Sequence, residues 1–444
     1  MIRLRRLWTS LRSSLWFVPA LMVACAVGLA AVLVSAEGIL GSELVRHHPR
    51  LFGADASGSR EMLSAIASSM ITVAGVTFSL TLVAITQASS QYTPRVLRNY
   101  MGDRVTQLFL GYFVAVFAYA LVVLRTIRSG EEDPFVPSAA VLAALVLAVA
   151  SVGILILFVH RIAGSIQAST IISSIAGETA HAIDNLFPEE LGEAEEEEPA
   201  ASVSQPQWKS VPASDSGYIQ DIDSEKLLAF AEEQTAVVRM SKGVGEFVTR
   251  GEPLLAITTE ATDETKSRLN GMFSLGHHRT IDQDSAFGVR QIVDIALKAL
   301  SPGVNDVTTA IVSLDYLGTI LARMARRRTA AWKRGTNGDL RVIGRGATFE
   351  SLADDAFDQI RDAARDNAAI YLRMLDTIGT VAAQTCAEER RRVLAAHVDR
   401  TQETALRCLQ SERNRSRLRS RVAEVKATLK GEGEGAGVRE VQRF

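Results

Sequence analysis

The chain has 444 residues, with 48 lysines and arginines against 50 aspartates and glutamates, and a formal net charge of −2. This balance gives no support for a nucleic-acid partner, which requires a basic surface. The three cysteines, Cys25, Cys386 and Cys408, cannot form a disulfide framework and fit a reducing cytosol. Apolar residues crowd into the first part of the chain and charged residues into the remainder, which predicts a membrane part followed by an aqueous part.

Four stretches without charged residues are long enough to cross a roughly 30 Å hydrocarbon core as helices. They cover about residues 15–35, 65–87, 107–124 and 137–159. Arginines precede the first stretch, separate the second from the third, and follow the fourth, so the positive-inside rule predicts a multi-pass inner-membrane protein with both termini cytoplasmic. The basic leader also resembles a signal peptide, but the first apolar run is long enough to span, and we expect an uncleaved anchor.

The second span is unusually polar for a membrane helix. Helical spacing places small and hydroxyl side chains on one face, namely Ser68, Thr72, Gly75, Ser79 and Thr86. A second stripe of small residues lies beside it, with Thr77, Thr81, Ala84 and Ala88. Such stripes serve either close helix packing or a wetted path, and the sequence leaves both possibilities open. No span carries an ionisable group, which argues against a proton- or cation-coupled carrier.

Polar residues mark the inner end of this span. Gln87 and Gln91 lie one helical turn apart, and Arg95 and Arg98 follow. We expect these four residues to form a cytoplasmic collar that attracts anions or anionic lipid headgroups. The alternative is that the arginines only satisfy the positive-inside rule.

The predicted fold is an α-helical membrane protein with four transmembrane helices, followed by a cytoplasmic α+β region. Residues 1–186 form the membrane domain, including a cytoplasmic extension of the fourth helix, and 187–207 read as an acidic linker. Period-two patterns and turn residues predict a small β-barrel or sandwich over 208–261. Residues 262–430 are predicted to form a helical bundle and 431–444 a disordered tail.

The phrase GEFVTRGEPLLAI resembles the strand–turn–strand of biotinyl and lipoyl carrier domains. The modified lysine of those carriers is absent from the matching turn, Thr249-Arg250-Gly251. The resemblance therefore implies a shape and not the carrier chemistry.

The most patterned polar segment is 279–309, RTIDQDSAFGVRQIVDIALKALSPGVNDVTT. Its polar side chains could line a cytoplasmic vestibule or ligand loop: Arg279, Asp282, Gln283, Asp284, Arg290, Asn305 and Asp306. Carboxylates and amides suit a hard cation, whereas arginine suits an anion, so the ligand class stays open. The structural alternative is that Asp284 or Ser285 caps one helix, Asp306 caps the next, and Arg290 pairs with Asp294.

That segment, together with QYTPRVLRNYMGDRVTQLFLGYF at 91–113, resembles a family of bacterial predicted membrane proteins catalogued as domain of unknown function 2254. The resemblance covers nearly the whole chain. It implies a membrane location and no particular activity.

No P-loop, GxSxG elbow, HExxH helix or dinucleotide glycine fingerprint occurs, so we expect no enzyme, no cofactor and no metal site. The adjacent His277 and His278 lack partners at zinc spacing and read as a surface pair. The leading hypothesis is an oligomeric, channel-like protein in contact with membrane lipid, with a cytoplasmic vestibule and an ion or small ligand still to be identified. The alternative is a non-conducting scaffold or sensor whose cytoplasmic domain binds a partner or small ligand.

Overall fold

The structure is a computed structural model, and it describes residues 16–47, 56–91, 104–128, 135–165, 167–187, 207–328, 332–334, 339–385 and 387–430. The chain separates into two compact units, residues 1–170 and 171–444.

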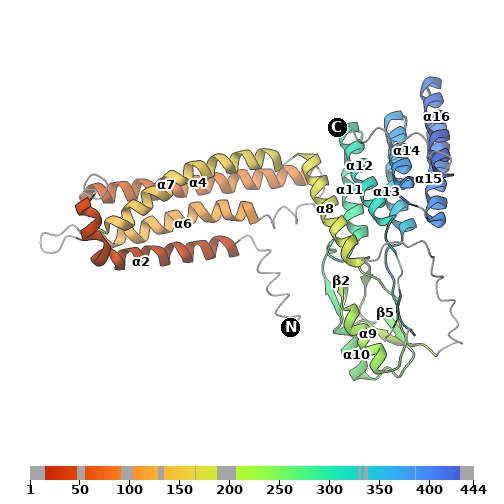
Figure 1. Ribbon diagram of the computed structural model, residues 1–444, viewed down its shortest axis with the longest axis horizontal. Helices are drawn as coiled ribbons and strands as arrows, with labels where there is room; N and C mark the ends of the chain where they lie inside the picture. Colours follow the sequence, from red (N-terminus) through yellow and green to blue (C-terminus); the bar gives the residue numbers. More distant parts are fainter. Residues whose placement is uncertain are drawn as a thin grey trace. The chain divides into compact units, whose positions relative to one another are not determined.

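The described part of the first unit contains four long helices, α2 (Phe17–His47), α4 (Ala56–Gln91), α6 (Arg104–Thr126) and α7 (Ser138–Ser165). Their runs of alanine, valine and leucine should be helical in a bilayer. No water is present there to bond the backbone, so every N–H and C=O group must find its hydrogen-bond partner within the segment. Helix α6 packs against each of the other three, and α7 also contacts α2 and α4 (Figure 1).

Aromatic residues of α6 hold this unit together. Phe113 and Tyr119 are fully buried. The hydroxyl of Tyr119 donates to the carbonyl of Ala140 at 2.9 Å, and that of Tyr112 to the carbonyl of Leu147 at 2.8 Å, so both bonds tie α6 to α7. These bonds satisfy the only polar groups of two large apolar side chains.

Among the residues that the structure describes, five helices are long and apolar enough to cross a membrane: Phe17–Ala36, Ala56–Gln87, Val105–Thr126, Ser138–Gly164 and Val307–Met324. The first four contain or closely match the four predicted spans, whereas the fifth was not predicted as one. Helix α4 begins well before residue 65, although it then includes Arg60 and Glu61. Arg60 is accommodated because its Nη2 donates to the carbonyl of Ile127 at 2.8 Å, at the end of α6.

The second unit combines strands and helices. Helix α8 (Ala168–Leu186) starts shortly after α7 ends at Ser165. The β region contains β1 (Lys209–Pro212), β2 (Gly217–Ile222), α9 (Ser224–Glu233), β3 (Val238–Met240), β4 (Phe247–Val248), β5 (Pro253–Ile257), α10 (Asp263–Asn270) and β6 (Phe273–Gly276). Then follow α11 (Ser285–Ala299), α12 (Val307–Met324), β7 (Trp332–Arg334), β8 (Leu340–Ile343), α13 (Phe349–Ala363), α14 (Ala368–Ala382), α15 (Glu388–Cys408) and α16 (Glu412–Leu429).

The strands form two sheets. One has the order β1-β5-β3-β8-β7, in which β3 and β8 are parallel and the other pairs antiparallel. The other is antiparallel with the order β4-β2-β6. Strands β6, β7 and β8 lie beyond residue 261, so the sheets draw on more of the chain than the predicted β module. Strands β4 and β5, which flank Thr249-Arg250-Gly251, belong to different sheets.

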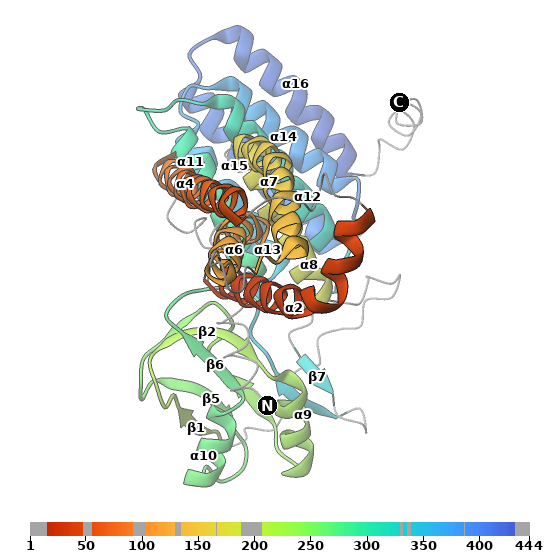
Figure 2. The ribbon, with the colours of Figure 1, turned by 90° about the vertical axis from the view of Figure 1, so that its left-hand side faces the viewer.

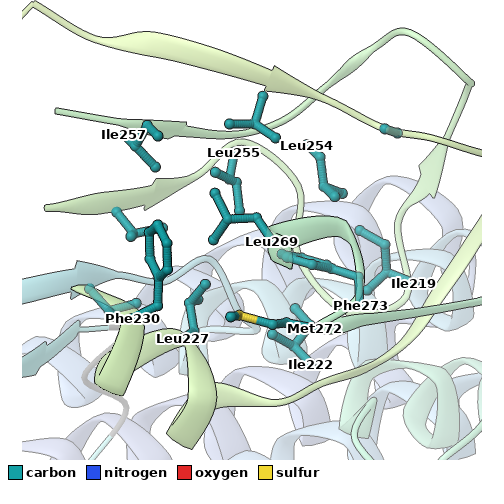
Figure 3. Close-up of a cluster of buried hydrophobic side chains, with 14 of the residues drawn as sticks. Ile219, Ile222, Leu227, Phe230, Leu254, Leu255, Ile257, Leu269, Met272 and Phe273 are labelled. Carbon is teal, nitrogen blue, oxygen red and sulfur yellow. The ribbon is translucent and has the colours of Figure 1, made fainter. Parts of the chain in front are cut away.

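The two sheets share one hydrophobic core with α9 and α10. Figure 3 shows its centre, where Leu227 and Phe230 of α9 approach Leu255 and Leu269. Strand β2 supplies Ile219 and Ile222 from the other sheet. These residues are three positions apart, and the register shift between Ile219 and Asp221 allows both to face the core. In Figure 2 the strands with α9 and α10 make one lobe of the unit, and α11 to α16 gather in the other.

Most helices of the second unit begin at a side-chain cap, which explains where they start. The cap residues are Asp223 for α9, Thr262 for α10, Asp284 for α11, Asp306 for α12, Thr348 for α13 and Asn367 for α14. Each such cap typically contributes about 1 kcal/mol. The carbonyls at the end of α12 are satisfied by Arg390 of α15, which donates to Met324 and Arg327.

Candidate functional site

The predicted polar face of the second span lies on the outside of α4. Ser68, Thr72, Gly75, Ser79 and Thr86 are all exposed, and a Cβ on Gly75 would meet nothing within 4 Å. Among the described residues of the first unit, no other helix therefore packs on this face.

The hydroxyls of this face are satisfied by α4 itself. Thr72 Oγ1 donates to the carbonyl of Ser68 and Ser79 Oγ to the carbonyl of Gly75, both at 2.9 Å. Such bonds make a hydroxyl tolerable in an apolar surrounding and leave its oxygen free to accept another bond. The face can thus meet either another helix or water.

The neighbouring stripe points the other way. Thr77 and Ala84 are buried, and Thr81 is partly buried. Thr77 and Thr81 also donate to carbonyls one turn earlier, at 2.8 Å. The two stripes thus differ in role. The buried stripe packs against other helices of the chain, whereas the exposed stripe is available to another helix or to water.

The predicted collar can be located only in part. Gln87 is exposed near the end of α4, and Gln91 is the last residue of that helix. Arg95 and Arg98 lie outside the described residues.

In the second unit, the half-buried Arg279 and the buried Asp284 form an ion pair through two contacts. Arg279 Nε lies 2.7 Å from Asp284 Oδ2, and Nη2 lies 2.9 Å from Oδ1. Asp284 is 5% exposed and its Oδ1 also accepts from the backbone N–H of Phe287 at 3.0 Å, which caps α11. Bidentate arginine–carboxylate pairs are among the strongest and most directional in proteins.

The turn before β4 lies in close contact with this pair. Gly245 has φ +84°, and a Cβ there would lie 2.1 Å from Asp284 Oδ2 and 3.0 Å from Arg279 Nη2. Gln283 adds a second tie, because its Oε1 accepts from the N–H of Ile222 in β2 at 3.1 Å. The start of α11 is therefore locked against the β region.

Two of the predicted vestibule residues lie apart from this pair. Asn305 and Asp306 follow the far end of α11, whose 15 residues span about 22 Å. Asp306 caps α12, accepting from Thr309 N at 3.0 Å. Arg290 pairs with Asp294 at 2.8 Å, and Asp282 is exposed. The capping and pairing roles proposed as the structural alternative are confirmed, and the structure does not bring the seven predicted residues together.

Sequence reasoning missed a cavity between α12 and α14. It has a volume of about 630 Å³ and its lining includes Arg323, Arg326, Arg327, Arg373, Asp315 and Asp376. These residues come from separate helices with no shared motif. The available signal was that α12, otherwise apolar, carries Asp315 and Arg323.

A second missed feature is a buried histidine between two helices. His397 of α15 is fully buried, and its Nε2 lies 3.3 Å from Asp354 Oδ1 while its Nδ1 lies 3.8 Å from Asp358 Oδ1. Burial lowers the pKa of His397 to about 4, with Arg400 contributing in the same direction.

These three residues are the one group among the described parts of the chain whose His and carboxylate atoms could surround a metal ion. Arg400 Nη1, however, lies 3.0 Å from Asp354 and 3.4 Å from Asp358, and Arg361 Nη2 lies 2.5 Å from Asp358. The guanidinium groups balance the carboxylates, so the cluster has no surplus negative charge for a cation. Its chemistry is that of an ion-pair network around a neutral imidazole.

Comparison with known proteins places these features in context. A family described as "Predicted membrane protein (DUF2254)" matches residues 12–380. An uncharacterized protein of Mycobacterium tuberculosis strain CDC 1551 is 31% identical over 394 residues, covering 86% of this chain and 74% of its own. An uncharacterized protein of Mycobacterium bovis is 30% identical with the same coverage. No solved structure matches.

Proposed function

The chain belongs to the family of predicted membrane proteins termed domain of unknown function 2254, and on that premise we propose that it is an oligomeric, channel-like protein of the inner membrane. In this proposal α4 of each copy turns its polar face toward the centre of the assembly. The second unit forms the cytoplasmic part, with the Arg279–Asp284 pair at its junction between helices and sheets.

The observation that carries the proposal is the exposed polar face of α4. The outward surfaces of α2 and α7 are large and apolar, as lipid requires, with Leu21, Val32, Val149 and Ile156 exposed. A continuous Ser/Thr/Gly face in lipid would serve no purpose, whereas between copies it permits close approach or lines a path. Closed symmetry would repeat the face around an axis.

We further propose that four helices cross the membrane and that α12 does not. Helix α12 contacts α11, α13 and α14, and two charged residues of α12 are paired with other elements of the second unit. Asp315 pairs with Arg373, and Arg323 with Asp184. Such charges are costly in a bilayer and ordinary in an aqueous domain. Four spans keep both termini on one side.

A second candidate is a non-conducting sensor or scaffold. The cavity between α12 and α14 favours it, since a volume of about 630 Å³ is in the range of small-molecule sites.

Cysteine cross-linking in membranes tests self-association through α4. In a chain whose native Cys25, Cys386 and Cys408 are replaced by serine, Ser79→Cys should form disulfide-linked dimers on mild oxidation. Val149→Cys, on the apolar outer face of α7 where the side chain is 66% exposed, is the matched control and should stay monomeric. Equal cross-linking at both positions, or none at Ser79→Cys, would show that α4 does not meet another copy.

A further inference from the structure

The cavity between α12 and α14 carries more guanidinium groups than carboxylates. Four arginines line it, Arg323, Arg326, Arg327 and Arg373, against two aspartates, Asp315 and Asp376. The two helices lie side by side in the second unit (Figure 1).

The ion pairs around the cavity leave a smaller positive excess, with five guanidinium groups against four carboxylates once Asp184, Arg421 and Glu424 are counted. Asp184 of α8 binds both Arg323 and Arg327, the latter at 2.8 Å. Asp315 binds Arg373, while Asp376 binds Arg421, which also pairs with Glu424. The C-terminal half charges of α12 and α14, whose last turns both line the cavity, reduce this excess further.

Arg326 takes no part in these ion pairs, so its guanidinium group can bind a ligand. It is exposed at the cavity and its side chain contacts no carboxylate among the described residues. The paired arginines also retain donors, because each guanidinium has five N–H groups and a carboxylate takes only some of them. Fixed by their carboxylates, Arg323 and Arg373 would reach an incoming oxyanion with little loss of side-chain freedom.

We propose that this cavity binds a small phosphate-bearing anion. A cavity of about 630 Å³ admits a molecule larger than a single phosphate. A planar guanidinium group can donate two parallel hydrogen bonds to two oxygens of one phosphate. Several guanidinium groups on neighbouring helical turns suit a ligand with more than one charged group. The proposal names a ligand class for the sensor candidate and does not require conduction, so binding and ion flux can fail separately.

Pyrophosphate is the probe. Isothermal titration calorimetry on the full chain in neutral detergent at low salt should show saturable binding. Arg326→Gln should weaken it about tenfold by removing a charge-assisted hydrogen bond. Because Arg326 makes no ion pair with a described residue, this variant should fold as the parent does.

Asp315→Asn provides a change in the opposite direction. It removes a negative charge that repels the anion and keeps a side chain of the same size that can still contact Arg373, so pyrophosphate should bind several-fold more tightly. Arg392→Gln, at an exposed arginine of α15 that pairs with Glu388, is the control and should leave binding unchanged. Absence of saturable binding overturns the proposal, as does unchanged affinity in both Arg326→Gln and Asp315→Asn.

The phosphate could belong to a soluble molecule or to a lipid headgroup. Repeating the titration in phosphatidylglycerol and phosphatidylcholine nanodiscs separates these sources. If pyrophosphate binds more weakly in phosphatidylglycerol than in phosphatidylcholine, and if Arg326→Gln abolishes this difference, the cavity is assigned to a lipid headgroup. Equal binding in both assigns it to a soluble ligand.

Discussion

Replacing Gly245 by alanine should lower the free energy of unfolding by about 3 kcal/mol. Forcing a side chain into a left-handed conformation costs about 1 kcal/mol. The added Cβ would also lie 2.1 Å from Asp284 Oδ2, so the ion pair between Asp284 and Arg279 must separate or shift. Losing hydrogen bonds between charged groups costs roughly 1.5–3 kcal/mol in addition. Denaturant unfolding of the full chain in detergent measures the change.

Gly251 is the matched control for this experiment. It has φ +86°, and a Cβ there would meet nothing within 4 Å. Gly251→Ala should therefore cost the strain alone, about 1 kcal/mol. Equal losses in the two variants would contradict the role assigned to the contact between Gly245 and the Arg279–Asp284 pair.

Acidification should destabilise the second unit through His397. In the folded chain burial lowers the pKa of His397 to about 4, whereas an unfolded histidine has a pKa of about 6.5. Between these values the unfolded chain binds the extra proton, so stability is fully present above pH 6.5 and is lost as the pH falls. From pH 7.5 to 5 the loss should be about 2 kcal/mol, a range in which ordinary carboxylates remain ionised.

The His397→Gln variant isolates this effect. It cannot take up the proton, and its free energy of unfolding should change much less over the same pH range. His278→Gln, at an exposed histidine, should keep the parental pH dependence. If the parent and His397→Gln show the same slope of unfolding free energy against pH, His397 is not the titrating group.

Local sequence signals predicted the parts of the fold that depend on local physics. Charge-free runs located the four long apolar helices, because the bilayer requirement acts on each segment alone. Asp284 and Asp306 were recognisable as caps, since a cap acts within one turn. The early start of α4 was not predictable, because it depends on a bond from Arg60 to a carbonyl of another helix.

Features that depend on distant segments escaped prediction. Strand β8 joins the sheet beside β3 about a hundred residues earlier in the chain, and nothing in either strand specifies its partner. His397 sits in a charged helix with no spacing signal, and only the packing of α13 on α15 places it against Asp354. The cavity arginines likewise converge from separate helices.

Ion flux through reconstituted protein tests the central claim most directly. Liposomes containing the parental chain should show flux under some voltage, osmotic or pH condition. Ser79→Trp on the outer face of α4 should reduce that flux, whereas Val149→Trp on the lipid-facing side of α7 should not. Absence of flux under every such condition, from protein shown to be folded and inserted, would contradict the channel account and leave the sensor candidate.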